Sequence, residues 1–302
     1  MRGIVLAGPT GVGKTDLSLK LAKLLGADII SSDSAQVYKE MNIGTAKIRE
    51  DEMQGIKHYM LDVIPPVEKY SVGEYQRAVD KILAEKEKEG KPVILTGGTG
   101  LYINSVVNGL SALPESNSEL REELMELSVD ELYEKLVGLD PEAAENIHKN
   151  NKKRVERAVE VCILTGEKFS VLSKKNIKNN NYDFLKVCLT RDRETLYKRI
   201  DMRVDIMMKQ GLLEEVENLY KKYGGEILRK INIIGYTQLI DYIEGKISLE
   251  TAVDLIKRDS RRYAKRQMTW FNNDKDYLWF DLEKQSENDI LKSIIDYYKT
   301  DA

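Results

Sequence analysis

Eight residues near the N-terminus have the types and the spacing of a phosphate-binding loop. The pattern G-x-x-x-x-G-K-[ST] is matched by Gly8, Pro9, Thr10, Gly11, Val12, Gly13, Lys14 and Thr15. In such a loop the backbone N–H groups face one anion, and the N-terminus of the next helix adds partial positive charge. We expect Lys14 to reach the outer phosphate and the Thr15 hydroxyl to bind Mg²⁺. The pattern leaves open whether the bound pyrophosphate is cleaved, transferred or released.

The residues on either side of this loop predict the elements that position it. An apolar run at 3–7 is typical of a buried strand, and Leu17, Leu21, Leu24 and Leu25 recur at helical spacing. Strand, glycine loop and helix together predict the core of a P-loop α/β protein, with a parallel sheet flanked by helices.

A second polar segment follows the next predicted strand, at 27–31. It begins at Ser31 and contains Asp33, Ser34, Ala35 and Gln36. Residues just past the carboxyl end of a parallel strand line the ligand crevice, so we expect Asp33 to lie near the group that the pyrophosphate carries. The alternative is that Asp33 only caps the next turn.

A third strand, ending at Leu95, breaks into the turn Gly97-Gly98-Thr99. The geometry repeats that of the first loop, so Thr99 could donate its hydroxyl to a phosphate oxygen; otherwise it is a plain turn residue. Two such loops in one sheet favour a shared site.

Arginines that could hold a pyrophosphate follow the predicted strand at 185–189. Arg193 and Arg199 are six positions apart, about 240 degrees around a helix, so they converge only if Arg193 lies at the helix start and folds over the crevice. The planar guanidinium of arginine binds phosphate oxygens in pairs. Which of the two carries more of the charge is left open.

Residues 113–182 are rich in Glu, Lys and Leu and contain no convincing strand, so we predict an all-helical insertion between core segments 1–112 and 183–302, closing in a surface loop at 174–181. One of its helices carries Lys152, Lys153, Arg154 and Arg157. A basic helix face is often only solvated. Further on, at 258–266, five cations lie near aromatic residues, a pattern that would suit an RNA backbone or a solvated helix equally.

Composition excludes several classes of protein. The 302 residues carry 47 basic and 50 acidic side chains, a net charge of −3, so the chain is not a globally cationic nucleic-acid binder. Cys162 and Cys188 have no partner motif, which predicts buried thiols in a reducing compartment. We expect no membrane span, no signal or transit peptide, and a cytoplasmic location.

A magnesium-binding aspartate of the kind many P-loop enzymes use is not evident. The segment Met60-Leu61-Asp62 is short and runs into Pro65 and Pro66, so we do not assign Asp62 that role. His58 is interpreted as an ordinary core or surface residue.

Taken together, the motifs resemble those of the tRNA dimethylallyltransferases, also called tRNA isopentenyltransferases. The matching segments are 8–15, Ser32-Asp33-Ser34-Ala35-Gln36-Val37-Tyr38, Ile43-Gly44-Thr45-Ala46-Lys47, 97–102, Ile234-Gly235-Tyr236 and 263–271. The resemblance implies transfer of a dimethylallyl group from its diphosphate, with Mg²⁺, to the N6 amine of the adenosine beside the anticodon (position 37) in tRNAs that read codons beginning with U. The partners it implies are the tRNA anticodon stem-loop and dimethylallyl diphosphate, with the chain acting as a monomer.

The resemblance also implies roles for particular residues. The general base would be Asp33, and Thr99 and Arg193 would hold oxygens of the leaving diphosphate, with Lys14 and Arg199 completing the catalytic and diphosphate-binding set. The residues implied to contact tRNA are Asp33, Ser34, Ala35, Gln36, Thr99, Arg121, Lys153, Arg154, Val155, Glu156, Arg157, Lys230, Ile231, Asn232, Ile233, Ile234 and Gly235.

Three other functions stay open at this point. A small-molecule P-loop kinase would transfer a phosphoryl group, but it would want a clear Mg²⁺ aspartate after a long apolar strand. An RNA-binding module that only senses nucleotide would form no product. An enzyme that prenylates free adenine nucleotides would not need the helical insertion or the basic segment at 258–266.

Overall fold

The computed structural model describes residues 2–111, 113–177 and 182–300. These residues form two compact units, one from Met1–Val107 with Asn180–Ala302 and one from Asn108–Asn179. The second unit therefore begins five residues before the predicted insertion start at 113 and ends three residues before its predicted end at 182. Part of the predicted surface loop, residues 178–181, lies outside the described residues.

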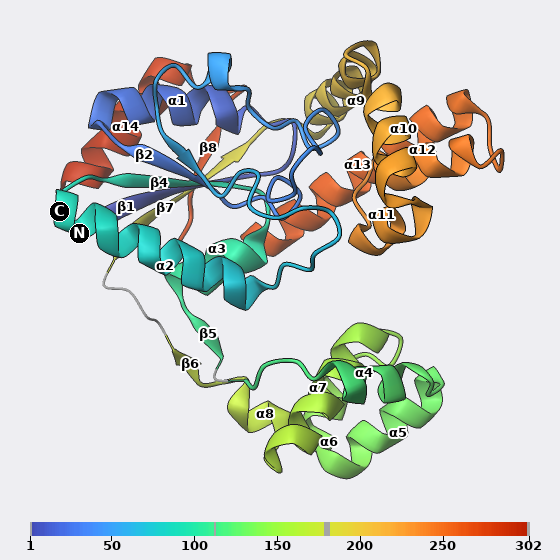
Figure 1. The fold of residues 1–302 in the computed structure, drawn as a ribbon. Coiled ribbons are helices and arrows are strands. Elements are labelled where there is room, and N and C mark those ends of the chain that lie inside the picture. Colours follow the sequence, from blue (N-terminus) through green and yellow to red (C-terminus); the bar gives the residue numbers. More distant parts are fainter. Residues whose placement is uncertain (1, 112, 178–181, 301–302) are drawn as a thin grey trace. The chain divides into compact units, whose positions relative to one another are not determined.

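The first unit is built on a six-stranded sheet in the order β3-β2-β4-β1-β7-β8, in which each of these neighbouring pairs is parallel. Its strands are β1 (Arg2–Ala7), β2 (Asp28–Ser31), β3 (His58–Tyr59), β4 (Val93–Gly97), β7 (Asp183–Thr190) and β8 (Leu278–Asp281). Because β4 lies between β1 and β2, the segments that follow these three strands emerge side by side at one edge of the sheet (Figure 1). The α/β fold class with a parallel sheet flanked by helices is thus confirmed.

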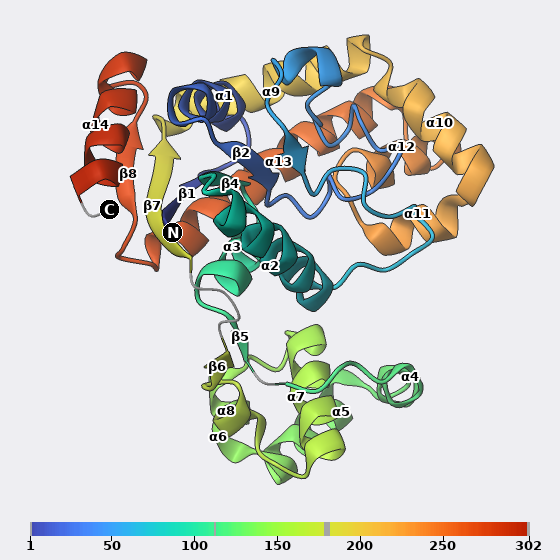
Figure 2. The ribbon, with the colours of Figure 1, turned by 60° about the vertical axis from the view of Figure 1, so that its left-hand side comes forward.

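Helices cover both faces of this sheet. Those of the first unit are α1 (Lys14–Leu25), α2 (Val72–Glu89), α3 (Gly100–Val107), α9 (Arg193–Lys209), α10 (Leu212–Tyr223), α11 (Gly225–Ile231), α12 (Tyr236–Ile243), α13 (Leu249–Asn272) and α14 (Glu287–Thr300), with a short 3-10 turn η1 (Glu50–Glu52). Figure 1 shows α1 and α14 along one face of the sheet and α2 and α3 along the other, and Figure 2 shows α2 and α3 side by side. Away from the sheet, an apolar cluster joins α10, α11 and α12 to the end of α9 and the start of α13. This cluster includes the fully buried Met41.

Local sequence explains where the site-bearing helices begin and end. Helix α1 starts directly after Gly13, whose φ of 113° is left-handed, and it ends at Gly26, with φ 64°. Both positions need the conformational freedom of glycine. The predicted spacing is confirmed in part: Leu17 and Leu21 are buried against the sheet and Leu25 is partly buried there, but Leu24 is 61% exposed.

In its described residues, the second unit consists of five helices and a two-stranded antiparallel sheet. These are α4 (Ser118–Met125), α5 (Val129–Leu139), α6 (Pro141–Asn146), α7 (Lys152–Thr165), α8 (Phe169–Leu172), β5 (Leu110–Ser111) and β6 (Asn176–Ile177). The prediction that 113–182 contains no strand is wrong at β6, which pairs with β5. Two residues are too few to give an alternating pattern, so only the pairing reveals this strand.

Other expectations can be compared directly. The strands predicted at 3–7, 27–31 and 185–189 are found within about two residues of β1, β2 and β7. The edge strand β3 was not predicted because it too is only two residues long. Both cysteines are free and buried, as expected. Within the described ranges, no helix combines the length and apolar character needed to cross a bilayer.

Candidate active site

Two cavities meet at the carboxyl edge of the sheet. The first, of about 400 Å³, is lined by the glycine loop and is called here the phosphate cavity; it includes Gly11, Gly13, Lys14, Thr15, Ser31, Gly97 and Gly98. The second, of about 570 Å³, is called the adjoining cavity; it includes Tyr38, Tyr102, Tyr263 and the segment 231–235. Thr10, Asp33 and Arg203 line both cavities, so these three residues mark the junction.

Cations hold the carbonyl groups of the glycine loop. Lys14 Nζ donates to the carbonyl oxygens of Gly8 (2.8 Å) and Pro9 (2.9 Å). The Nε of Arg199 donates to Gly11 O at 2.9 Å, and the Nε of Arg191 donates to Val12 O, also at 2.9 Å. The loop N–H groups other than those of Thr10 and Val12, which donate to Gln267 Oε1 and Pro9 O, are left to bind an anion. Arg199, expected to bind diphosphate, thus lines the phosphate cavity while its Nε supports the loop.

Burial sets the charge behaviour of Lys14. Removal from water lowers the pKa of its ammonium group to about 8, while the nearby Asp33 carboxylate opposes the shift and Arg203 adds to it. The ammonium group is therefore still mostly charged at pH 7 but loses its proton at a lower pH than an exposed lysine does. A bound diphosphate would favour the charged form of Lys14.

Asp33 is held in a turn at the junction. Its Oδ1 accepts the backbone N–H of Ala35 at 2.9 Å, so the carboxylate does make the short turn contact of the alternative interpretation. Asp33 also lines both cavities, so its contact in the turn is compatible with a position next to the ligand. The hydroxyl of Thr99 accepts the N–H of Ser34 at 3.0 Å. Thr99 is not among the described residues that line the two cavities. Its contact with Ser34 instead holds the Asp33 turn in place.

The arginine at the junction is Arg203, which the sequence interpretation did not select. Its Nη1 donates to the Thr10 hydroxyl at 3.2 Å. Burial lowers the pKa of the Arg203 guanidinium, and the Asp33 carboxylate opposes that shift. Arg193, by contrast, is exposed at the start of α9, with its guanidinium carbon 5.2 Å from the centre of the Tyr197 ring, and it lines neither cavity. The spacing that could have revealed the pair is i, i+4: Arg199 and Arg203 share one face of α9.

Gln267 on α13 links the two glycine loops, a role that the sequence interpretation missed. Its Oε1 accepts the N–H of Thr10 at 2.9 Å, and its Nε2 donates to Gly98 O at 3.0 Å. A Cβ at Gly98 would lie 2.0 Å from the Gln267 Nε2, so this position accepts only glycine while the glutamine is in place. The signal was its position in the matching segment 263–271.

Oxygen donors suited to Mg²⁺ are present but few. The exposed Thr15 and the Asp33 carboxylate both line the phosphate cavity. Within the described part of the chain, no group of three or more His, Cys, Asp or Glu could hold a metal ion. The Asp62 carboxylate instead accepts a hydrogen bond from the Lys47 ammonium group at 2.6 Å. The residues fit an ion that takes most of its ligands from phosphate oxygens and water, as Mg²⁺ does with phosphate substrates.

His58 also lines the phosphate cavity, and its half-buried ring with a backbone partner agrees with its interpretation as a core or surface residue. Its Nδ1 lies 2.9 Å from Ile56 O. Burial lowers the pKa of the imidazole, so the ring is neutral near pH 7.

The cations of 258–266 fall into two groups. Arg261 pairs with Asp201 of α9, and Arg258 pairs with the adjacent Asp259. Arg262 and Arg266 are exposed and line the adjoining cavity, and Arg262 also lies 3.5 Å from the Asp259 carboxylate. Only this second pair has the placement expected of an RNA-binding face.

The residues implied to contact tRNA are also divided. In the first unit, Ser34, Ala35 and 231–235 line the adjoining cavity, whereas Lys230 is exposed and pairs with Glu226. In the second unit, Lys153 and Arg154 are exposed.

The side chain of Val155 is 1% exposed and belongs to the core of the second unit, so it cannot supply a tRNA contact as predicted. Arg121 and Arg157 converge on the fully buried Glu160, which ties both guanidinium groups to the unit's interior. Glu156 on the same helix is half-buried.

A family model described as IPP transferase matches residues 36–274. The chain belongs to this family. The match begins after the glycine loop and Asp33, but full-length relatives of the family cover those residues as well. A tRNA dimethylallyltransferase of Fusobacterium nucleatum is 58% identical, covering 100% of this chain and 98% of the relative. One from Clostridioides difficile is 48% identical, covering 99% and 97%.

Solved structures of the IPP transferase family have the same fold. The full-length tRNA isopentenylpyrophosphate transferase from Bacillus halodurans is 37% identical with a TM-score of 0.74, covering 99% of this chain and 97% of its own. A eukaryotic dimethylallyltransferase, described as acting on tRNA, has a TM-score of 0.86 at 27% identity, covering 99% and 80%. These likenesses support the P-loop core with a parallel sheet.

Proposed function

We propose that this chain is a tRNA dimethylallyltransferase that uses dimethylallyl diphosphate. Its acceptor is the N6 amine of the adenosine at position 37, beside the anticodon, in tRNAs that read codons beginning with U. The observation that carries the proposal is the junction, where Asp33 lines both the cavity of the glycine loop and a second cavity large enough for another substrate. The relatives' name supports the reaction class.

The reaction exchanges one bond for another. The bond between the allylic carbon and the diphosphate oxygen breaks, and its electron pair leaves with the diphosphate. The N6 atom forms a bond to that carbon and loses a proton, which the Asp33 carboxylate accepts. An amine conjugated to a ring is a weak nucleophile, so a base within reach assists the attack.

Stabilising the leaving diphosphate is the task of the phosphate cavity. The loop N–H groups, Lys14 and Arg203 supply positive charge before the bond breaks, so no reorganisation is needed as charge develops. Mg²⁺ held by Thr15 would neutralise further charge on the departing oxygens and would leave the Asp33 carboxylate free to accept the proton. Arg203 replaces Arg193 in this proposal because only Arg203 lies at the junction.

The adjoining cavity has the properties of an acceptor pocket. Tyr38, Tyr102 and Tyr263 offer aromatic surface, and Arg262 and Arg266 offer cations for the phosphate backbone. The adenine must leave its stack to bring N6 to the allylic carbon. Exposed Lys153 and Arg154 in the second unit are proposed as further tRNA contacts.

The test uses radiolabelled dimethylallyl diphosphate and unmodified tRNA. Label should pass to wild-type tRNA and not to a tRNA with guanosine at position 37. Asp33→Asn keeps an oxygen for the Ala35 N–H but cannot take the proton, so its single-turnover rate should fall by about 100-fold or more while tRNA affinity is retained. Near-normal turnover by Asp33→Asn would contradict the assignment of the base. Phosphoryl transfer from ATP, or label on free adenine nucleotides alone, would favour the kinase or nucleotide alternatives.

A further inference from the structure

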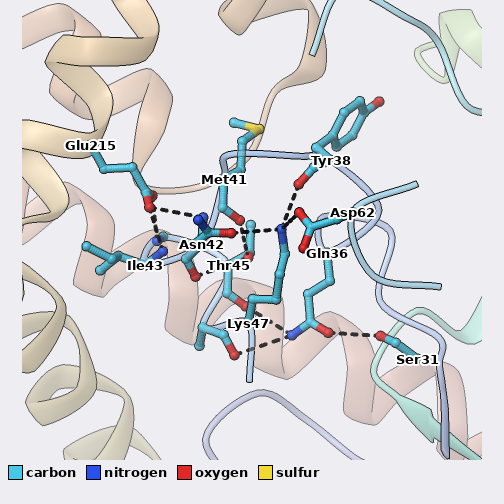
Figure 3. A network of polar contacts seen from close by, with 12 residues as sticks. Ser31, Gln36, Tyr38, Met41, Asn42, Ile43, Thr45, Lys47, Asp62 and Glu215 are labelled. Carbon is cyan, nitrogen blue, oxygen red and sulfur yellow. Dashed lines mark hydrogen bonds and ion pairs between the residues drawn. The ribbon is translucent and has the colours of Figure 1, made fainter. Parts of the chain in front are cut away.

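Two of the matching segments, 43–47 and 234–236, were given no role in the bond-making and bond-breaking steps, yet the structure brings them together. The residue that joins them is Glu215, near the start of α10, and Figure 3 shows its carboxylate beside Asn42 and Ile43. Its Oε2 accepts the backbone N–H groups of Asn42 (3.0 Å) and Ile43 (2.8 Å). Its Oε1 accepts the N–H of Gly44 (3.1 Å) and the hydroxyl of the fully buried Tyr236 (2.6 Å).

The opposite side of the same segment is held by Gln36. Its Nε2 donates to the carbonyl oxygens of Thr45 (3.2 Å) and Ala46 (3.4 Å), and its Oε1 accepts the Ser31 hydroxyl at 2.8 Å. Gln36 also closes the Asp33 turn, because its N–H donates to Asp33 O at 3.2 Å. A continuous set of hydrogen bonds therefore runs from Glu215 to the Asp33 turn.

A buried lysine completes the clamp. Lys47, whose side chain is 4% exposed, donates to Tyr38 O (2.7 Å), Asn42 Oδ1 (3.1 Å) and Asp62 Oδ1 (2.6 Å). Figure 3 shows its ammonium group at the centre of these oxygens. A buried cation with three acceptors pins both ends of the segment.

The segment does not hold this shape through its own preferences. Ala46 has a φ of 46°, a left-handed conformation that disfavours a side chain, and Glu40 just before the segment has a φ of 66°. Gly44 lies so close to Tyr236 that a Cβ would be 2.5 Å from the ring. Partners elsewhere in the chain must impose the conformation.

The segment also forms part of the site. Gly44 and Thr45 line the adjoining cavity, and Ala46 lines the phosphate cavity. Glu215 lies on α10, the helix that follows Arg203-bearing α9. A displaced segment would alter the walls of both cavities and the turn that carries Asp33.

We propose that Glu215 is a positioning residue that holds segment 42–46 and, through Gln36, the Asp33 turn, so that Asp33 and Arg203 act on one substrate pair. The inference rests on the proposed function for its kinetic readout. The Glu215 carboxylate bonds to segment 42–44 and Tyr236 and lines neither cavity among the described residues, so diphosphate binding should depend on it little. The rate of the chemical step should depend on it strongly.

The test compares Glu215→Gln and Glu215→Ala with wild type. Glutamine fills the same space but places an N–H₂ group against a donor N–H, so some of the four hydrogen bonds disappear; alanine removes all of them. Single-turnover rates at saturating tRNA and dimethylallyl diphosphate should fall about 10-fold for Glu215→Gln and about 100-fold for Glu215→Ala. The Kd for inorganic diphosphate, measured by calorimetry, should stay within about threefold of wild type.

A matched control is Glu214→Gln. Glu214 is exposed, lies in the same first turn of α10 and lines neither cavity, so its substitution removes the same charge near the same helix terminus. We expect its rate and its diphosphate Kd to equal those of wild type. Hydrogen exchange at residues 42–44 should quicken in both Glu215 variants and not in this control.

The outcomes separate this inference from the proposed function. If wild type forms no prenylated tRNA, the proposed function fails, and exchange at 42–44 still tests the clamp. A wild-type rate for Glu215→Ala, equal losses of rate and of diphosphate affinity, or unchanged exchange at 42–44 would each overturn the positioning role. Partial recovery of rate in Glu215→Gln relative to Glu215→Ala, with diphosphate binding intact, supports it.

Discussion

Lys14 and Arg203 are buried cations, and burial disfavours the charged form of each. Both interact with the carboxylate of Asp33. Burial lowers the pKa of each, and Asp33 offsets part of the shift in both cases. A site that is costly to keep charged when empty gains most from an anionic ligand, because the ligand restores the favourable interactions that water no longer supplies. Diphosphate binding and proton binding at Lys14 should therefore be linked.

This linkage predicts the pH dependence of diphosphate binding. Free Lys14 has a pKa of about 8, and a bound anion raises it. Below pH 8 the ammonium is already charged; above pH 8 binding must take up a proton, so affinity falls by up to about tenfold per pH unit. Calorimetry with dimethylallyl diphosphate at about pH 9, in buffers of different ionisation enthalpy, should reveal the uptake. Lys14→Arg, which stays charged, should abolish this dependence; a persisting slope would contradict the assignment.

The two candidate arginines of α9 make opposite predictions. Arg203→Ala removes a cation from the junction and should lower the single-turnover rate by about 100- to 1000-fold. Arg193→Ala removes an exposed cation stacked near Tyr197 and should leave the rate within about twofold of wild type. Thermal melting of both variants shows whether either has lost its fold. A larger loss in Arg193→Ala would restore the sequence-based choice.

At the level of elements, the sequence predicted those features that depend on residues close together in the chain. The glycine loop, its strand and α1 followed from spacing and capping alone, because each depends on residues within about one turn or one strand. The Glu215 hydrogen bonds to segment 42–44 join residues 171 to 173 positions apart, and Gln267 reaches Thr10 across 257 positions. No periodicity carries such information. Arg203 was missed for a related reason: its place at the junction depends on the packing of α9 against the glycine loop.

Helix α13 divides its cations between stability and binding. Arg261 is engaged by Asp201, so Arg261→Ala should lower the free energy of unfolding by about 1 kcal/mol or less and leave the salt dependence of tRNA binding unchanged. Arg262→Ala combined with Arg266→Ala should flatten the plot of log affinity against log salt by roughly one unit for each phosphate that the two side chains bind in wild type. Filter binding over a salt series and urea unfolding measure the two effects. A flatter slope for Arg261→Ala would place that residue on the RNA as well.

On the scale of the whole molecule, the chain has two units with separate cores. All the residues assigned to the chemistry lie in the first, and Leu132, Leu136 and Val159 are among the buried side chains of the second. A shift in composition sufficed to predict that such an insertion exists. The roles of its side chains could not be predicted residue by residue, because the burial of Val155 and the bonds of Arg121 and Arg157 to the buried Glu160 depend on how its helices pack.

The separate cores predict that tRNA affinity and diphosphate affinity can be changed independently. Lys153→Glu combined with Arg154→Glu reverses two exposed charges on α7 and should weaken tRNA binding by about tenfold or more, while the Kd for diphosphate stays unchanged. The control is Lys135→Glu combined with Lys175→Glu, the same change in charge at exposed positions of the same unit, which should have a much smaller effect. Equal losses of tRNA affinity in both variants would mean that only the net charge of the second unit matters. In that case α7 would not be part of the tRNA interface.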